Sequence, residues 1–226
     1  MVYNTWVVFP SATVEKANSA VTAWRNRGYH TLVFQDLGSK ACEADVVRMG
    51  QFPGYYRVIN SLVLQAVAEE GADIVTCIGD DMLPDPYATA EDIAKSYFKI
   101  WPHGEGVLQA TGDMQGVDES GVQAAARICG SPTFGRRWIY ESYEGRGPFW
   151  SGYQNFYADE DLHDVAFSLG LLRNDPQITF LHQHWSWGWS DRAEYHKRNS
   201  DNTWEADAAL YASRRAEKFP HSGFVK

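Results

Sequence analysis

Two adjacent aspartates, Asp80 and Asp81, directly follow a run of strand-forming residues in the stretch IVTCIGDD. Neighbouring carboxylates repel each other, so a pair at a strand end is stabilised by a nearby cation. Mg²⁺ is often held in proteins by one or two carboxylates while substrate phosphates supply its remaining ligands. The alternative is a solvent-exposed turn, since the segment DDMLPDP is rich in turn-forming residues. Spacing alone leaves both interpretations open.

Two histidines occur late in the chain, in the stretch QITFLHQHW. His182 and His184 are two residues apart, so on a strand their side chains point to the same side. Imidazole combined with carboxylate ligands favours Mn²⁺ over Mg²⁺. The alternative is a pair of buried histidines that only make hydrogen bonds, because this motif by itself is weak.

Four acidic residues, Asp159, Glu160, Asp161 and Asp164, lie at the start of a predicted helix in the stretch ADEDLHD. The helix macrodipole favours negative charge at this end, which explains some of them. A carboxylate at this position that faces a metal at a strand end would instead serve as a general base toward a hydroxyl group.

Arg136 and Arg137 follow two glycines in the stretch CGSPTFGRR. Glycine allows a ligand to approach the backbone closely, and arginine suits phosphate. A solvated basic turn is the alternative. The net charge of −9 means that the average surface repels polyanions, although local clusters of arginine remain.

The elements that must position these residues alternate between strand and helix. The patterns predict strands over 5–10, 29–36, 73–79, 106–113 and 177–185, and helices over 12–27, 56–70, 88–98, 159–170 and 202–219. Ser11 is the predicted N-cap of the first helix, and the segment 37–54 is predicted to be a loop. This order indicates an α/β fold with a mostly parallel sheet flanked by helices. Ligands of such sheets bind at the carboxyl ends of the strands, where Asp36 and the Asp80–Asp81 pair would meet.

Composition limits the class of protein. The chain has 226 residues and 44% hydrophobic content, which suits one globular domain rather than a disordered chain. No apolar run approaches the roughly 20 residues that a membrane span needs, and the N-terminus has no secretory pattern. Three widely spaced cysteines favour a reducing compartment, so we expect a cytoplasmic protein with no membrane partner.

The order of these motifs along the chain resembles the GT-A-fold glycosyltransferases, in particular the family-2-like enzymes. The resemblance covers nearly the whole chain, from Asp36 through IGDDMLPDP, GVLQATGD, GSPTFGRR and ADEDL to HQHW. The run from GVLQATGD to RGPFW also resembles small glycosyltransferases of phage genomes. The resemblance implies a single domain over 1–226, with the nucleotide-sugar site in 1–100 and the acceptor site and C-terminal helix in 101–226.

The resemblance also implies roles for individual residues. Asp81 matches the metal-binding position of the DxD motif and Asp80 its middle position, while Gly79 replaces the first acid. Asp36 matches an acid near the nucleotide base. Asp159 matches the catalytic base, with Asp161 as its rival.

Further implied roles concern the metal, the diphosphate and the sugars. His184 is preferred over His182 as a metal ligand, and Arg136 and Arg137 are assigned to the donor diphosphate or the acceptor. The aromatic residues Trp150, Tyr153, Trp185 and Trp187 are candidates for stacking on sugars.

The implied activity is metal-dependent transfer of a sugar from a nucleotide-diphosphate sugar, with inversion at the anomeric carbon as the first expectation and retention as the alternative. Mn²⁺ or Mg²⁺ is the expected metal, and a UDP-sugar is the leading donor. The acceptor stays open between a glycan of a surface polysaccharide, a small molecule and a hydroxylated base in phage DNA, in the host cytoplasm if the chain is phage-encoded. Two other classes remain as alternatives, a nucleotidyltransferase and a carbohydrate-binding module without catalytic activity.

Overall fold

Seven strands form one sheet in the order β3-β2-β1-β4-β7-β6-β8. The structure is a computed structural model that describes residues 2–37, 40–110, 127–183 and 194–224, with side chains of 194–202 omitted. The two pairs that β7 makes, with β4 and β6, are antiparallel, and the other four pairs are parallel. The strands are β1 (Thr5–Ser11), β2 (His30–Asp36), β3 (Val46–Gly50), β4 (Ile74–Cys77), β6 (Val107–Ala110), β7 (Pro132–Gly135) and β8 (Leu172–Asp175).

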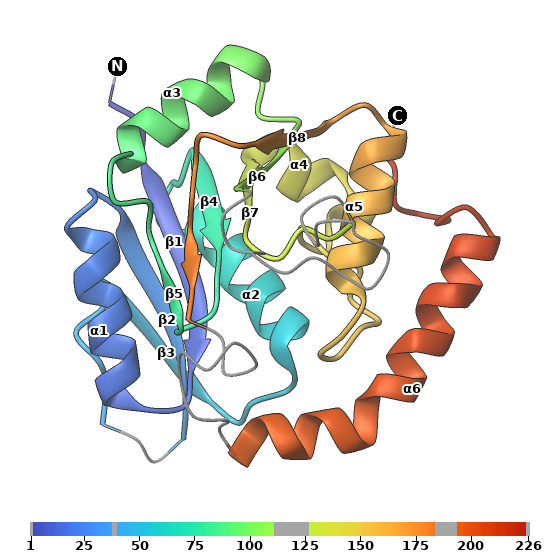
Figure 1. Cartoon of the computed structure of the whole chain (residues 1–226), viewed down its shortest axis with the longest axis horizontal. Coiled ribbons are helices and arrows are strands. Elements are labelled where there is room, and N and C mark those ends of the chain that lie inside the picture. Colours follow the sequence, from blue (N-terminus) through green and yellow to red (C-terminus); the bar gives the residue numbers. More distant parts are fainter. Residues whose placement is uncertain (1, 38–39, 111–126, 184–193, 225–226) are drawn as a thin grey trace.

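Helices cover both faces of this sheet, so the molecule has three layers (Figure 1). On one face the core contains α1 and α3, and on the other it contains α2, α4 and α5. The longest helix, α6, runs along the side of the molecule that carries α5. The helices are α1 (Val14–Arg25), α2 (Tyr55–Ala68), α3 (Ala90–Ile100), α4 (Arg136–Glu141), α5 (Ala158–Ser168) and α6 (Glu194–Ala216), with a short 3-10 helix, η2 (Tyr143–Gly145).

Strand β1 shows why a sheet between two helical layers forms. Its side chains alternate between the two faces, as strand geometry requires. Val7 and Phe9 pack in the core beneath α1 and α3, whereas Trp6 and Val8 pack in the core beneath α2. A strand with apolar residues on both faces is typical of a mostly parallel sheet. The predicted fold class, a mostly parallel sheet flanked by helices, is confirmed.

Three local predictions differ from the structure. The first helix is capped by Thr13, whose side chain accepts from the amide of Lys16, and Ser11 belongs to β1. The predicted loop over 37–54 contains β3, an edge strand whose exposed Arg48 and Met49 hide its periodicity. The predicted late strand over 177–185 is only β9 (Leu181–His182) within the described residues, and it pairs with β5 (Met82–Leu83).

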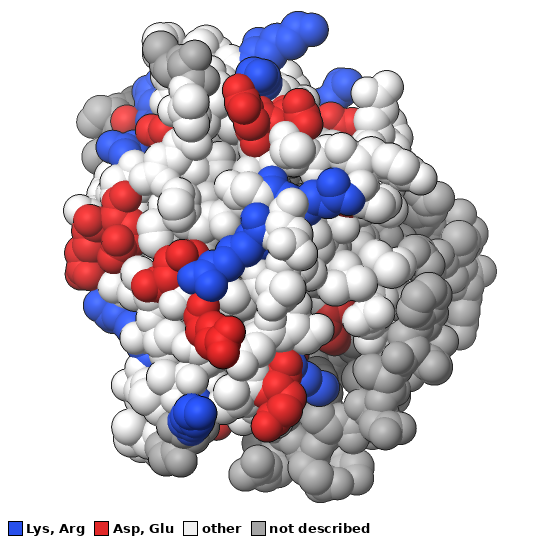
Figure 2. Space-filling view, turned by 90° about the vertical axis from the view of Figure 1, so that its left-hand side faces the viewer, with Lys and Arg blue, Asp and Glu red and all other residues white. Residues whose placement is uncertain are grey.

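Charges on the surface are mixed in sign. On the face at the side of α1, acidic and basic side chains are interspersed, and Arg25 pairs with Asp45 at 2.6 Å (Figure 2). Among the described residues, no helix combines the length and the apolar character that a membrane span requires.

Candidate functional site

The acid pair lies at the carboxyl end of β4. The hydroxyl of Ser11, at the end of the neighbouring β1, donates a hydrogen bond of 2.7 Å to Oδ2 of Asp80. Burial raises the pKa of Asp80, the hydrogen bond from Ser11 opposes this rise, and the charge of Asp81 adds to it. The pair therefore lies where an added cation would be electrostatically favoured.

Gly79 stands at the position of the first acid of the expected motif, and the carboxylate of Asp81 lies close to it. A Cβ atom at this position would lie 2.6 Å from Oδ1 of Asp81, closer than non-bonded atoms approach. The carboxylate of Asp81 thus folds back over the backbone of Gly79. Any side chain at position 79 would have to displace it.

His182 is held beside Asp81 by a short antiparallel contact between β5 and β9. Met82 pairs with His182, and the amide of Gln183 donates to the carbonyl of Asp81 at 2.8 Å. As a result, Nε2 of His182 lies 3.4 Å from Oδ1 of Asp81. Both side chains are about one-fifth exposed, so an external ligand can reach them.

The segment that carries His182 is also fixed by a buried aspartate. Asp85, 4% exposed, accepts through Oδ1 from the amides of Tyr87 and Ala88 and through Oδ2 from the amide of Thr179. The predicted ligand His184 lies outside the described residues. Among the residues that are described, no group of three or more potential metal ligands converges.

Asp36 lies at the same edge of the sheet as the acid pair. It ends β2, is exposed, and is separated from β4 by β1 alone. Two strand spacings correspond to roughly 10 Å, which is within the length of a nucleotide.

The structure does not bring Arg136 and Arg137 to this edge. Because β7 is antiparallel to β4, its end at Gly135 pairs with Ile74 at the start of β4. The guanidinium of Arg136 donates to the carbonyls of Gly71 and Ala72, and Arg137 pairs with Glu141 at 2.8 Å. At a strand rise of about 3.3 Å per residue, the start of β4 lies roughly 20 Å from the acid pair.

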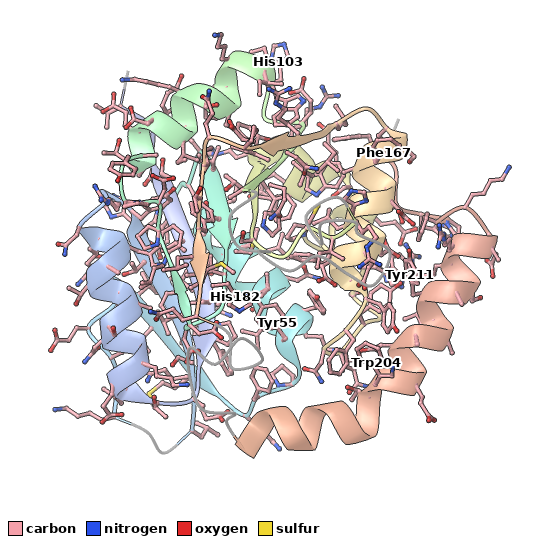
Figure 3. The ribbon with its side chains drawn as sticks, in the orientation of Figure 1. Tyr55, His103, Phe167, His182, Trp204 and Tyr211 are labelled. Carbon is pink, nitrogen blue, oxygen red and sulfur yellow. The ribbon has the colours of Figure 1, made fainter. Side chains whose placement is uncertain are left out.

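The side chain of Tyr55 reaches the end of β4 that carries the acid pair. Its hydroxyl donates to the carbonyl of Ile78 at 3.0 Å. Burial raises the pKa of Tyr55 well above its usual value, and the charges of Asp81, Asp159 and Asp80 add to the rise. Tyr55, at the start of α2, and His182, on β9, lie in the same region of the molecule (Figure 3).

Asp159 lines a small pocket of about 150 Å³ beneath α6. Its Oδ1 accepts a hydrogen bond of 3.0 Å from the hydroxyl of Tyr56, and Trp204 of α6 also lines the pocket. Burial, the charge of Asp159 and a hydrogen bond to Asp159 together raise the pKa of Glu160 to about 9. Burial beside the Asp159 carboxylate thus favours the protonated form of Glu160.

Asp161, the rival base, has different surroundings. It is 0% exposed, and its Oδ2 accepts from Nε of Arg214 at 2.6 Å. The hydroxyls of Tyr143 and Tyr153 donate to its two oxygens, each at 3.0 Å. These contacts join α5 to α6, and they leave no exposed oxygen for a substrate.

A turn before α5 positions Asp159. The carboxylate of Asp207 on α6, 2% exposed, accepts from the backbone amides of Gln154, Asn155 and Phe156 at 2.9–3.3 Å. Tyr157 follows in the left-handed region, with φ of 64°, and begins α5. Helix α6 thereby fixes the turn from which the candidate base projects.

Two of the aromatic candidates have structural positions. The ring of Tyr153 is 0% exposed, and the guanidinium of Arg214 lies 3.9 Å from the ring centroid of Trp150. Trp185 and Trp187 lie outside the described residues. Trp204, which we did not single out from the sequence, is 49% exposed and lines the pocket at Asp159.

Sequence reasoning also missed Tyr55, Tyr56 and the structural role of Asp207. The sequence gives little indication of these roles. The two tyrosines after Gly54 look like ordinary residues at the start of a helix, and Asp207 looks like an ordinary exposed polar residue of a helix. Only the packing of α2 and α6 against α5 brings these residues to the site.

No family model matches the chain, and no curated protein matches it. Among solved structures, the chain is similar to a mutant of Drosophila beta-1,4-galactosyltransferase 7 in complex with manganese, UDP-Gal and xylobiose. The sequence identity is 14%, the match covers 87% of this chain and 74% of that one, and the TM-score is 0.50. Together with the sheet order, this similarity gives the chain a GT-A-like fold.

Two further structures are similar at lower TM-scores. A protein from STIV matches at 12% identity and a TM-score of 0.46, covering 79% of this chain and 84% of that one. HddC from Yersinia pseudotuberculosis matches at 10% identity and a TM-score of 0.41, covering 80% and 93%.

Proposed function

We propose that the chain is a metal-dependent glycosyltransferase that uses a nucleotide-diphosphate sugar. The observation that carries this proposal is the gathering of Asp80, Asp81 and His182 beyond the carboxyl end of β4. The similarity to a galactosyltransferase solved with manganese and UDP-Gal supports it through the fold.

Asp81 and His182 would hold the divalent ion. Carboxylate and imidazole together suit Mn²⁺, and the raised pKa of Asp80 reflects burial and negative charge that a cation would offset. Phosphate oxygens of the donor and His184 would complete the coordination. When bound, the ion would neutralise charge that develops on the leaving diphosphate.

Asp159 is the proposed general base. The acceptor hydroxyl gives its proton to Asp159 while its oxygen forms a bond to the anomeric carbon. The bond from that carbon to the diphosphate oxygen breaks, and the diphosphate leaves with the electron pair. Attack opposite to the leaving group inverts the anomeric centre. Tyr56 orients the base through its hydrogen bond to Oδ1.

The donor is proposed to be a UDP-sugar, with Asp36 near the nucleotide base. Arg136 and Arg137 have no role in this proposal, because they lie at the other end of β4. The division into a donor half over 1–100 and an acceptor half over 101–226 stays part of the proposal.

The test is thermal denaturation with Mn²⁺ and, separately, UDP, GDP, dTDP and CMP. We expect one nucleotide to stabilise the protein only when the metal is present. At a concentration of 100 times Kd the gain is about 2.7 kcal/mol, or about 5–10 °C in Tm.

Asp81→Asn should abolish this stabilisation while leaving the Tm of the free protein close to that of the wild type. Glu91→Gln, on the exposed surface of α3, is the matched control and should respond like the wild type. Absence of any response to all four nucleotides in the wild-type protein would contradict the proposed function and favour a binding module.

A further inference from the structure

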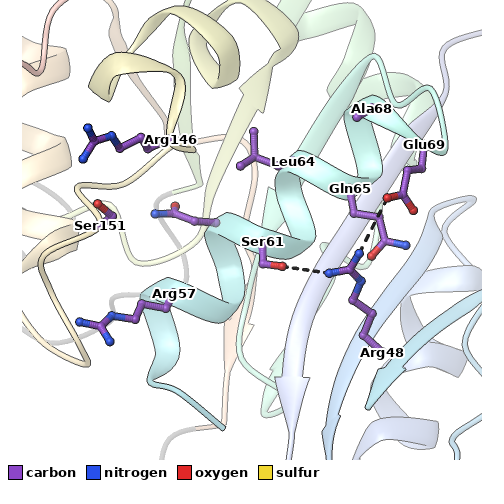
Figure 4. Close-up of a pocket in the computed structure, with 10 residues that line it drawn as sticks. Arg48, Arg57, Ser61, Leu64, Gln65, Ala68, Glu69, Arg146 and Ser151 are labelled. Carbon is purple, nitrogen blue, oxygen red and sulfur yellow. Dashed lines mark hydrogen bonds and ion pairs between the residues drawn. The ribbon is translucent and has the colours of Figure 1, made fainter. Parts of the chain in front are cut away.

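A depression of about 480 Å³ lies along the exposed side of α2 (Figure 4). Three arginines line it, and they come from three different parts of the chain. Arg48 belongs to β3, Arg57 to the first turn of α2, and Arg146 to the segment after η2. We call this depression the basic groove, and its other lining residues are Asn60, Ser61, Leu64, Gln65, Ala68, Glu69 and Ser151.

The positive charges of the basic groove are available to a ligand. Arg57 is exposed and has no carboxylate partner among the described residues. Arg48 lies 3.8 Å from Glu69, and Arg146 lies 3.2 Å from Glu144. Exposed pairs of this kind contribute only about 0–1 kcal/mol, so a competing anion can displace the carboxylates.

The chemistry of the lining residues selects the kind of anion. Guanidinium groups match phosphate oxygens in geometry and donate two hydrogen bonds at once. No aromatic side chain is among the residues that line the groove, so it offers no surface on which sugar rings or bases would stack. A groove with these properties recognises a charged backbone rather than rings.

The length and the position of the groove indicate a polymer. The lining residues extend along α2 from Arg57 to Glu69, which corresponds to roughly 18 Å at the helical rise. A nucleic-acid strand carries one negative charge per roughly 3.4 Å of helix axis, so it would present several phosphates over this length. Arg57 lies in the first turn of α2, and the amide of Tyr55 in the same turn donates to Asn155, which lines the pocket at Asp159. One end of the groove therefore lies at the helix turn that adjoins this pocket.

We propose that the basic groove binds the phosphodiester backbone of a nucleic-acid acceptor, whose reactive hydroxyl enters the pocket at Asp159. This inference rests on the proposed function, since it names the acceptor of the same reaction. It also gives a role to the three arginines that line one depression in a chain of net charge −9.

The test is fluorescence anisotropy with a 5′-fluorescein-labelled oligothymidylate in 50 to 200 mM NaCl, without metal or sugar donor. We expect the logarithm of the binding constant to fall linearly with the logarithm of the salt concentration, with a slope of about −0.7 for each phosphate contacted. Arg57→Gln and Arg146→Gln should each weaken binding about tenfold, the loss of one charge-assisted contact, and should make the slope shallower.

Arg173→Gln is the matched control, because Arg173 is exposed on β8 and lies outside the groove. It removes the same charge and should bind the oligonucleotide almost as the wild type does. Equal binding by the wild type, R57Q and R146Q would overturn the inference. Stronger competition by polygalacturonate than by unlabelled oligothymidylate would also overturn it, because the ligand would then be an anionic glycan.

The two proposals fail in different ways. In the nucleotide titration with Mn²⁺, R57Q should behave as the wild type does. If R57Q loses oligonucleotide binding but still binds the nucleotide with Mn²⁺, the groove serves the acceptor and not the donor. If the wild type binds no nucleotide, the proposed function fails, whatever the result with the oligonucleotide.

Discussion

Two aspartates in the first turn of α5 differ in almost every physical respect. Asp159 is half-buried, lines a pocket and accepts one hydrogen bond from Tyr56. Asp161 is fully buried and is neutralised by Arg214 and two tyrosine hydroxyls. Two positions along the helix thus separate a residue that can meet a substrate from one that maintains the fold.

Substitution of each aspartate by asparagine should separate the two roles. Asp159→Asn should lower kcat by about 10²–10⁴-fold, the usual contribution of a general base, while Kd for the nucleotide and the Tm stay close to wild type. Asp161→Asn should lower the free energy of unfolding by about 3–5 kcal/mol, because it leaves the buried guanidinium of Arg214 without a counter-charge. Urea denaturation and single-turnover kinetics measure the two effects. Full turnover by D159N would remove this residue from the mechanism.

The raised pKa of Glu160 gives the protein a pH-dependent stability. The folded-state pKa of Glu160 is raised above its unfolded value, so its contribution to stability is fully present below about 4.5 and is lost as pH rises toward 9. Glu160→Gln should remove this loss, so the variant should exceed the wild type in Tm at pH 8 by a few degrees, about 2–4 °C per kcal/mol.

The comparison at pH 5 is the internal control for E160Q. There the Tm difference between the variant and the wild type should be smaller than at pH 8, because Glu160 is already protonated in more of the unfolded chains. A Tm difference that is independent of pH would contradict a raised pKa of Glu160 in the folded protein.

The residues at strand ends were the ones that sequence could locate. Asp36, Asp80 and Asp81 were predicted to share an edge because each lies at or just past the end of a predicted strand, and parallel strands share their carboxyl ends. Arg136 and Arg137 were grouped with them by the resemblance alone. They follow β7, which is antiparallel to β4, and nothing in PTFG indicates the direction of this strand.

At the level of elements, side chains of α6 hold the turn before α5 in place. Asp207 accepts from three consecutive backbone amides, and Thr203 accepts from the side chain of Asn155. Asn155 in turn accepts from the amide of Tyr55, at the start of α2. The turn before α5 therefore couples α6 to both candidate tyrosines.

Asp207→Ala should lower the free energy of unfolding by at least about 2 kcal/mol, because it removes a charged acceptor and leaves buried amides without a partner. It should also lower kcat by loosening the pocket at Asp159. Urea denaturation and turnover measure both effects. Glu205→Ala, exposed on the same helix, is the control, and equal losses in the two variants would contradict a positioning role for Asp207.

Helices were easier to predict than edge strands. Helix α5 ends two residues before Gly170, which has φ of 69°, close to the predicted boundary. Strand β3 was missed because, as an edge strand, it exposes Arg48 and Met49 and lacks the alternation that marks a half-buried strand.

At the level of the whole molecule, one sheet spans both halves of the chain. The strands β1 to β4 come from the first half and β6 to β8 from the second, and they join where β4 pairs with β7. The hydroxyls of Thr76 and Thr133 share a buried hydrogen bond of 2.8 Å at this junction. One core cluster also contains residues of both halves.

The halves should therefore not fold separately. A fragment of residues 1–100 exposes β4 as an edge and loses the core contributed by α4 and α5, so we expect the far-UV circular dichroism of an unfolded chain. The intact chain should unfold in one transition by fluorescence and circular dichroism alike. A fragment with a cooperative transition of its own would instead support an independent donor half.

The three cysteines, all buried and without a disulfide, provide a built-in chemical probe of local opening. Cys77 lies within the central strand β4, so a thiol reagent reaches it only after global unfolding. The amide of Cys129 donates to the backbone carbonyl of Asp159, so Cys129 lies beside the backbone of the candidate base. Labelling of Cys129 that is faster than labelling of Cys77, and that an acceptor analogue slows, would show local opening. The segment beside Asp159 would then open and close while the sheet stays folded.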